Sequence, residues 1–166
     1  MSDGRSVVVM KTVVMMCFLL VSSVGFAADK RFGNVVVEEV TSIYDADTFR
    51  VNIKGWPDVV GQRMSVRVLG VDAPEIRGKC ELEKKAARRA KQFTVQKLLS
   101  AKKIELRDIQ RGKYFRLLAN VYVDGKSLAQ ALIREKHARK YDGGKRKGWC
   151  SQAIFINSSV EWLKPV

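Results

Sequence analysis

The chain has 166 residues, 46% of them hydrophobic, and a formal net charge of +14. Without an N-terminal targeting segment, this length suffices for one domain with a hydrophobic core and excludes two. Such a basic excess on a small domain attracts polyanions through long-range electrostatics and counterion release, which makes nucleic acid the leading candidate partner. General solubility and attraction to an anionic membrane surface are alternatives that charge alone leaves open.

The first 27 residues have the layout of a secretory signal. Arg5 and Lys11 precede an uncharged apolar run over residues 12–26, and small residues follow at its end. The run is shorter than the roughly 20 apolar residues that span a bilayer, which argues against a membrane anchor. We therefore expect a signal peptide at residues 1–27 and one domain at residues 28–166, periplasmic or secreted, with no stable membrane anchor after cleavage.

The cysteines divide between the two parts of the chain. Cys17 leaves with the signal peptide, so Cys80 and Cys150 remain. Two cysteines in an exported domain predict one disulfide, worth on the order of 4 kcal/mol by loop entropy. A metal site would need further Cys or His ligands, and the domain has only His137, which we expect to be a surface residue of a helix rather than a catalyst.

The first half of the domain predicts three strands and a helix. Residues 35–44 and 48–53 form a hairpin around a turn at residues 45–46, and residues 62–70 form a third strand. An amphipathic helix with a basic outer face follows over residues 81–100. The third strand places Met64, Val66 and Val68 on one face. The expected inner face of the helix consists of Leu82, Ala86, Ala90, Phe93 and Thr94.

The second half predicts two more strands and a second helix. The strands cover residues 103–109 and 117–123, and a tight turn follows at residues 124–125. A capping box at residues 127–130 starts a helix that we expect to reach about residue 140. Its expected inward residues are Leu128, Ala131, Leu132 and Ala138. The tail contains a flexible turn, a basic patch of Lys145, Arg146 and Lys147, and Ser151, which could cap a short last helix.

Five short strands with about three helices predict an α+β, mainly β, fold. The first three strands are joined too tightly for helical crossovers, which favours a small closed barrel over a layered α/β sheet. The oligonucleotide-binding (OB) barrel is the natural candidate. This fold alone implies binding and not cleavage.

Three clusters carry candidate chemistry. The first is the Asp-Ala-Asp-Thr turn at residues 45–48, weak by itself because aspartates are common in turns. The second is residues 67–75, where Pro74 fixes the backbone between two acids at the end of a strand that carries an arginine. The third is the basic and aromatic loop at residues 113–116, Lys-Tyr-Phe-Arg.

Together these clusters resemble the staphylococcal nuclease family, the thermonucleases. The family motifs are an Asp-Gly-Asp-Thr turn, an Arg-(x)4-Asp-x-Pro-Glu segment and a Tyr-Gly-Arg loop, and they occur here in order over residues 35–141. Four positions depart from the pattern: Ala46 for Gly, Ala73 for Thr, Phe115 for Gly, and Gly112 where some members have an acid. Phe115 could shift the reach of the following arginine or add a stacking surface.

The resemblance implies a Ca²⁺ site with Asp45 directly behind its ligands. The implied ligands are Asp47, Asp72 and the backbone carbonyl of Ala73. Glu75 would deprotonate or orient the attacking water, and Arg67 and Arg116 would hold the phosphate. The residues implied to contact the rest of the substrate are Lys113, Tyr114 and Tyr141.

Phosphodiester hydrolysis independently requires such a set. The substrate repels nucleophiles by its negative charge, and a hard oxygen-ligated cation lowers that repulsion and activates water. Two guanidinium groups can hold the non-bridging oxygens as charge builds in the transition state.

The resemblance therefore implies a calcium-dependent endonuclease, expected to be a monomer, that cleaves DNA and RNA with little sequence preference and leaves 3′-phosphate ends. A disulfide between Cys80 and Cys150 would fasten the active-site entrance to the C-terminal tail. One alternative is a non-catalytic OB-fold module that binds nucleic acid. Another is a membrane-tethered basic protein acting on envelope polyanions.

Overall fold

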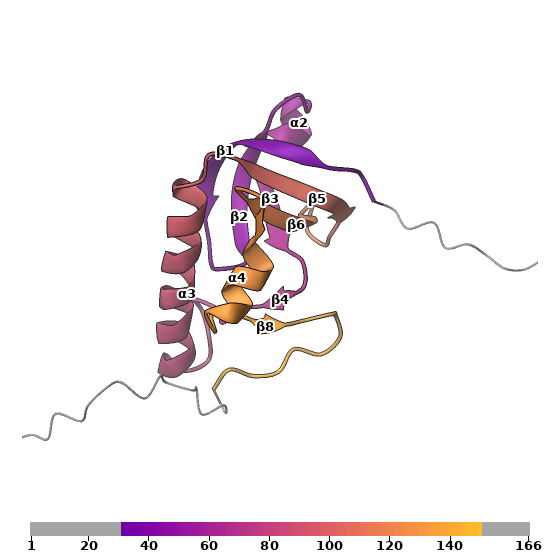
Figure 1. Ribbon diagram of the computed structural model, residues 1–166. Coiled ribbons are helices and arrows are strands. Elements are labelled where there is room, and N and C mark those ends of the chain that lie inside the picture. The colour runs from indigo at the N-terminus through magenta and orange to yellow at the C-terminus, as the bar shows by residue number, and fades with distance from the viewer. Residues whose placement is uncertain (1–30, 151–166) are drawn as a thin grey trace, which may run out of the picture. The chain divides into compact units, whose positions relative to one another are not determined.

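Five strands form a closed barrel in the computed structural model, which describes residues 31–150 (Figure 1). The barrel strands are β1 (Val35–Ile43), β2 (Thr48–Ile53), β3 (Met64–Val68), β5 (Ile104–Arg111) and β6 (Leu117–Val123). They pair in the order β3-β2-β1-β5-β6, and a parallel pairing of β3 with β6 closes the ring. This is the predicted five-stranded OB barrel.

The barrel core follows from strands whose side chains alternate between interior and surface. Met64, Val66 and Val68 of β3 are all buried, as predicted, and the strand β6 has the predicted bounds. The register of β2 on β3 places Thr48 opposite Arg67. This pairing brings the arginine of the second motif beside the turn of the first.

Shorter elements complete the described chain. They are α2 (Asp58–Gly61), β4 (Val71–Asp72), β7 (Lys126–Ser127) and β8 (Arg139–Lys140). Gly70 has a φ of +79°, a conformation that glycine adopts without strain, and it turns the chain from β3 into β4. β4 pairs antiparallel with β8, with Asp72 opposite Arg139.

Helix α3 (Glu81–Leu99) has nearly the predicted bounds, and Ala90 and Thr94 are buried as predicted, but its buried face is rotated. Leu82, expected inside, is 51% exposed. The inward residues are Glu83, Ala87, Ala90, Thr94 and Leu98. The face is rotated because Glu83 turns inward to accept hydrogen bonds from the backbone N–H groups of Glu75 and Lys79. The hydroxyl of Thr94 donates to the carbonyl of Ala46 at 2.8 Å, which fixes α3 to the first motif.

Helix α4 (Leu128–Arg134) is shorter than predicted. The predicted cap is present, since the side chain of Ser127 accepts from the backbone N–H of Gln130. The prediction of a helix to residue 140 was wrong. Lys136 adopts a left-handed φ of 58°, and the backbone N–H groups of His137 and Ala138 both bond to the carbonyl of Leu132. The chain thereby leaves the helix and runs into β8.

His137 follows α4 instead of lying within it, and its ring packs on Phe93 with 4.9 Å between centroids. The expected signal peptide and the possible helix after Ser151 lie outside the described residues. Within residues 31–150, no helix has the length and apolar character needed to cross a membrane.

Candidate active site

The turn between β1 and β2 holds Asp47 in the barrel wall. Asp47 is 1% exposed, and Arg67 donates to its two carboxylate oxygens at 2.9 Å each. The Thr48 hydroxyl and the Ala73 backbone N–H donate to the same carboxylate at 2.9 and 3.4 Å. Burial raises the pKa of Asp47 and the Arg67 charge opposes this effect. Asp47 is thus locked in place by neighbours from two motifs.

Asp45 lies next to Asp47, is 3% exposed, and has no hydrogen-bond partner for its Oδ1 atom among residues 31–150. Burial, followed by the negative charges of Asp47 and Glu75, raises the pKa of Asp45 to about 8. Buried polar atoms in proteins almost always have partners. The unpartnered oxygen and the crowded carboxyl groups, which cannot all ionise without a compensating charge, therefore favour an external cation at this position.

Asp72 is also buried, at 3% exposure, but its partners come from the C-terminal part of the chain. Arg139 donates to its Oδ2 atom at 2.8 Å, and the Trp149 indole N–H donates to the same oxygen at 3.2 Å. The Arg139 guanidinium also stacks on the Trp149 ring at 3.8 Å. This network joins β8 and the tail to the end of β4.

Arg146 reaches into the same acids from the tail. Its Nε atom donates to Asp72 Oδ1, its Nη1 atom to Glu75 Oε1 at 2.6 Å, and its Nη2 atom to the carbonyl of Ala73 at 3.1 Å. Partial burial lowers the pKa of Arg146, but hydrogen bonds to Glu75 and Asp72 outweigh this effect and raise the pKa overall. The guanidinium is therefore always charged, and three oxygens converge on it.

A cleft of about 440 Å³ is lined by Glu75 and Asp45. Its lining includes most of the predicted site. The lining residues are Tyr44, Asp45, Thr48, Arg67, Glu75, Lys113, Arg116, Leu118, Tyr141 and Arg146. Arg116 has a buried Nε atom that, within the described part of the chain, lacks a hydrogen-bond partner. A guanidinium group that lines a cleft and has a nitrogen without a partner suits an anionic ligand.

The turn that carries Arg116 has an unusual backbone. Tyr114 and Phe115 have left-handed φ angles of 58° and 53°, although neither is glycine. Their side chains are 92% and 58% exposed, and the Arg111 guanidinium lies 4.4 Å above the Phe115 ring. Phe115 thus adopts the conformation expected of the glycine that it replaces, and Arg116 still reaches the cleft.

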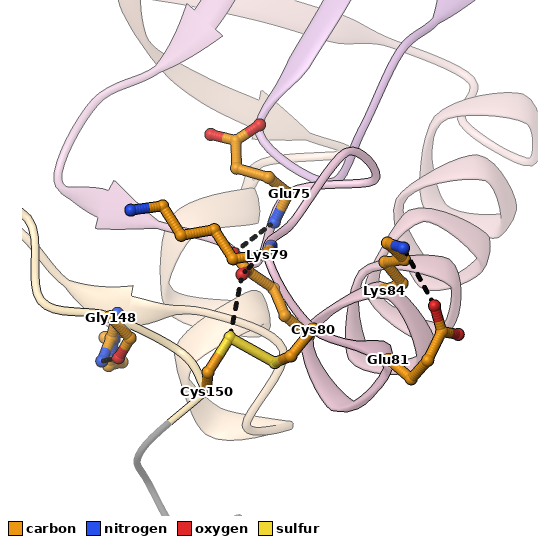
Figure 2. Close-up of a disulfide and its surroundings, with 9 residues drawn as sticks. Glu75, Lys79, Cys80, Glu81, Lys84, Gly148 and Cys150 are labelled. Carbon is orange, nitrogen blue, oxygen red and sulfur yellow. Dashed lines mark hydrogen bonds and ion pairs between the residues drawn. A yellow bond between two sulfur atoms is a disulfide. The ribbon is translucent and has the colours of Figure 1, made fainter.

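Hydrogen bonds and a disulfide hold the loop after Glu75 in place (Figure 2). The Glu83 carboxylate accepts from the backbone N–H groups of Glu75 and Lys79, and Cys80 is joined to Cys150 by the predicted disulfide. Figure 2 shows the Glu75 carboxylate pointing away from this disulfide. A side chain at Gly78 would collide with Glu83, at 2.4 Å. The loop is therefore held closely against α3.

The donor set fits a hard divalent cation. Carboxylate and carbonyl oxygens are the ligands that Ca²⁺ takes in proteins. Asp72, the Ala73 carbonyl and Glu75 already surround one positive group, and Asp45 has a buried oxygen without a partner. Asp47 adjoins this set through the backbone of Ala73.

The predicted residues thus lie close together, although the predicted cation ligands Asp47, Asp72 and Ala73 do not themselves line the cleft. Asp45, expected behind the metal ligands, lines the cleft, whereas Asp47 is covered. Tyr141 lines the cleft, but its hydroxyl donates to the Gly144 carbonyl at 2.8 Å. Tyr114 is exposed and is not among the residues that line the cleft.

Sequence reasoning missed the tail residues Arg139, Arg146 and Trp149. The sequence indicates only a basic patch at Lys145, Arg146 and Lys147. One signal could have found it, because Arg146 lies four residues before a cysteine that was expected to bond next to the active-site loop. Glu83 was missed because its charge indicated an outer helix face.

Comparison with known proteins agrees with the motifs. Residues 65–153 match a family model described as staphylococcal nuclease homologue. The chain is 35% identical over 117 residues to endonuclease YncB of Bacillus subtilis (strain 168), covering 66% of this chain and 49% of that protein. It is 36% identical over 102 residues to the SPbeta prophage-derived endonuclease YokF of the same organism, covering 57% of this chain and 31% of that protein. The chain thus spans about half and about a third of these relatives.

Proposed function

Because the chain belongs to the staphylococcal nuclease family, we propose that it is a metal-dependent endonuclease that hydrolyses phosphodiester bonds in DNA and RNA. The observation that carries the proposal is the cleft in which Arg67, Arg116 and Glu75 meet beside buried carboxylates. The same arrangement would serve single or double strands, because none of these groups reads a base.

The residues divide the chemistry among them. Arg67 and Arg116 hold the non-bridging phosphate oxygens and stabilise the charge that builds on them in the transition state. Glu75 accepts or orients the proton of the attacking water. Asp47, Asp72 and the Ala73 carbonyl would hold Ca²⁺, with Asp45 beside them. Once bound, the cation would lower the repulsion between the phosphodiester and its nucleophile.

Finer features of the proposal rest on the family resemblance. We propose Ca²⁺ as the cation, 3′-phosphate ends as products, and Lys113, Tyr114 and Tyr141 as further substrate contacts. Lys113 and Tyr141 line the cleft, which supports their part. Export through cleavage after residue 27 and a monomeric state also belong to the proposal. N-terminal sequencing of the mature protein and light scattering would test them.

The activity test compares the wild type with Glu75→Gln and with Glu38→Gln, which removes an exposed carboxylate on β1. Single-stranded DNA, double-stranded DNA and RNA are incubated with each protein in calcium or in chelator. We expect cleavage only in calcium, a loss of about 10²-fold or more in Glu75→Gln, and no loss in Glu38→Gln. Undiminished cleavage by Glu75→Gln would overturn the mechanism. Tight binding without cleavage by the wild type would indicate the non-catalytic module instead.

A further inference from the structure

Arg146 occupies the oxygens that the proposed function assigns to a cation. Its guanidinium contacts Asp72 Oδ1, the Ala73 carbonyl at 3.1 Å and Glu75 Oε1 at 2.6 Å. The first two are proposed cation ligands, and the third belongs to the proposed base. A guanidinium and a divalent cation cannot use the same oxygens together, because the sites coincide and the charges repel.

The segment that carries Arg146, residues 142–150, is anchored at both ends. At its start, the Tyr141 backbone N–H donates to the Gly70 carbonyl at 3.0 Å. Near its end, Arg139 donates to the carbonyls of Lys147 and Gly148 at 2.7 and 3.2 Å. These anchors restrict Arg146 to the neighbourhood of the acids.

The disulfide provides a covalent anchor at the end of this segment. Cys150 is bonded to Cys80, which lies five residues after Glu75 and at the start of α3. A tethered group competes at an effective concentration set by the length of its tether. Three residues separate Arg146 from the bonded cysteine, so that concentration is high while the disulfide is intact.

We propose that Arg146 is an internal competitor of the catalytic cation and determines the metal affinity of the site, with the Cys80–Cys150 disulfide strengthening the competition. The inference rests on the proposed function, since it needs a cation at these oxygens. The cation binds by displacing the guanidinium from Asp72, Ala73 and Glu75. The competition lowers the affinity for the cation by the free energy of those contacts. The affinity rises again when the competing charge is removed.

Calcium binding alone tests the competition, without any nuclease assay. Isothermal titration calorimetry with CaCl₂ compares the wild-type chain with Arg146→Gln, which keeps a hydrogen-bonding side chain but removes the charge. Lys145→Gln is the matched control, because it removes the same charge one residue away. We expect Arg146→Gln to bind Ca²⁺ about tenfold more tightly or better, and Lys145→Gln to change the affinity less than about twofold. Equal dissociation constants for Arg146→Gln and Lys145→Gln would overturn the inference and leave the proposed function standing.

Absence of calcium binding in every protein, including Arg146→Gln, would instead refute the proposed cation site and the inference with it. A second variant tests the tether. Cys80→Ser/Cys150→Ser keeps Arg146 but frees its segment, so we expect tighter calcium binding than in the wild type. If this double variant binds calcium as the wild type does, the disulfide does not strengthen the competition.

Displacement of Arg146 by calcium can also be observed in the wild-type chain. Trp149 donates to Asp72 and stacks on Arg139, so release of the segment changes its surroundings. Calcium should alter the tryptophan fluorescence of the wild type, and the change should be lost in Trp149→Phe. A calcium-saturated wild type with unchanged emission would contradict displacement, even if Arg146→Gln failed to fold.

Discussion

Asp47 and Asp72 are both buried at the ends of strands, and both pair with arginine, but the arginines come from different parts of the chain. Asp47 pairs with Arg67, which the register of β2 on β3 places beside it. Asp72 pairs with Arg139 of β8 and Arg146 of the tail. One aspartate is therefore held by the barrel itself and the other by the C-terminal region.

The balance of charge also differs between the two aspartates. Around Asp47, the carboxylates of Asp45 and Glu75 add negative charge, and one arginine opposes it. Around Asp72, the guanidinium groups of Arg139 and Arg146 meet the aspartate, and Arg146 also binds Glu75. The Asp47 side therefore has an excess of carboxylates, whereas on the Asp72 side the Arg146 guanidinium contacts the oxygens that we propose for a cation. The difference teaches that a complete set of ligands does not by itself set the affinity of a site.

The largest effect on stability and activity should follow from removing the arginine that pairs with Asp47. Arg67→Gln leaves a buried carboxylate without its charged partner, so we expect the free energy of unfolding to fall by about 3–5 kcal/mol. Nuclease activity should fall by about 10²-fold or more, because a phosphate ligand is lost. Urea unfolding and cleavage assays measure the two effects. Arg50→Gln, which removes an exposed arginine of β2, is the control, and an equal effect of both variants would contradict the comparison.

The Asp72 side can be loosened by removing the disulfide. Cys80→Ser/Cys150→Ser opens a loop with a sequence separation of 70 residues, which by loop entropy costs on the order of 4 kcal/mol. We expect the melting temperature to fall by about 10 °C. Dithiothreitol should lower the melting temperature of the wild type similarly and leave the double variant unchanged. A wild type insensitive to the reductant would show that no bridge forms in solution.

The smallest effect concerns Phe115, which precedes Arg116 in the loop. No ion pair of Arg116 is found within residues 31–150. Phe115→Gly removes a side chain from a left-handed position, so we expect stability to rise by about 1 kcal/mol. If the exposed ring stacks on an unpaired base, affinity for single-stranded DNA should fall about tenfold. Urea unfolding measures the stability, and fluorescence anisotropy in chelator measures the affinity for single-stranded DNA. Phe32→Gly removes an equally exposed ring, at 58%, as a control. Unchanged affinity would exclude stacking by Phe115.

Local patterns predicted the barrel well because strand periodicity is local. The alternation of Met64, Val66 and Val68 gave the buried face of β3 directly. The inner face of α3 could not be predicted in the same way. Glu83 is charged, and only the folded loop around Lys79 supplies the backbone donors that make its burial favourable.

The end of helix α4 likewise could not be predicted from the local sequence. Leu128 and Leu132 are buried as predicted, because a helical period brings them to one face. The end of the helix depends on Lys136 in a left-handed conformation, which glycine would have signalled and lysine does not. Pairing of β8 with β4 then determines the path of the chain.

By itself, the sequence determined the barrel, the acids and arginines of the candidate site, and the partners of the disulfide. Alternating side chains specify strands, and a motif with a fixed spacing specifies which groups meet at their ends. Only the tertiary structure decided that Arg146 lies among those acids. The segment around Arg146 has no periodic pattern, and its position depends on long-range contacts with Gly70, Asp72 and Cys80. These contacts join residues 70 or more positions apart in the sequence, so no local pattern encodes them.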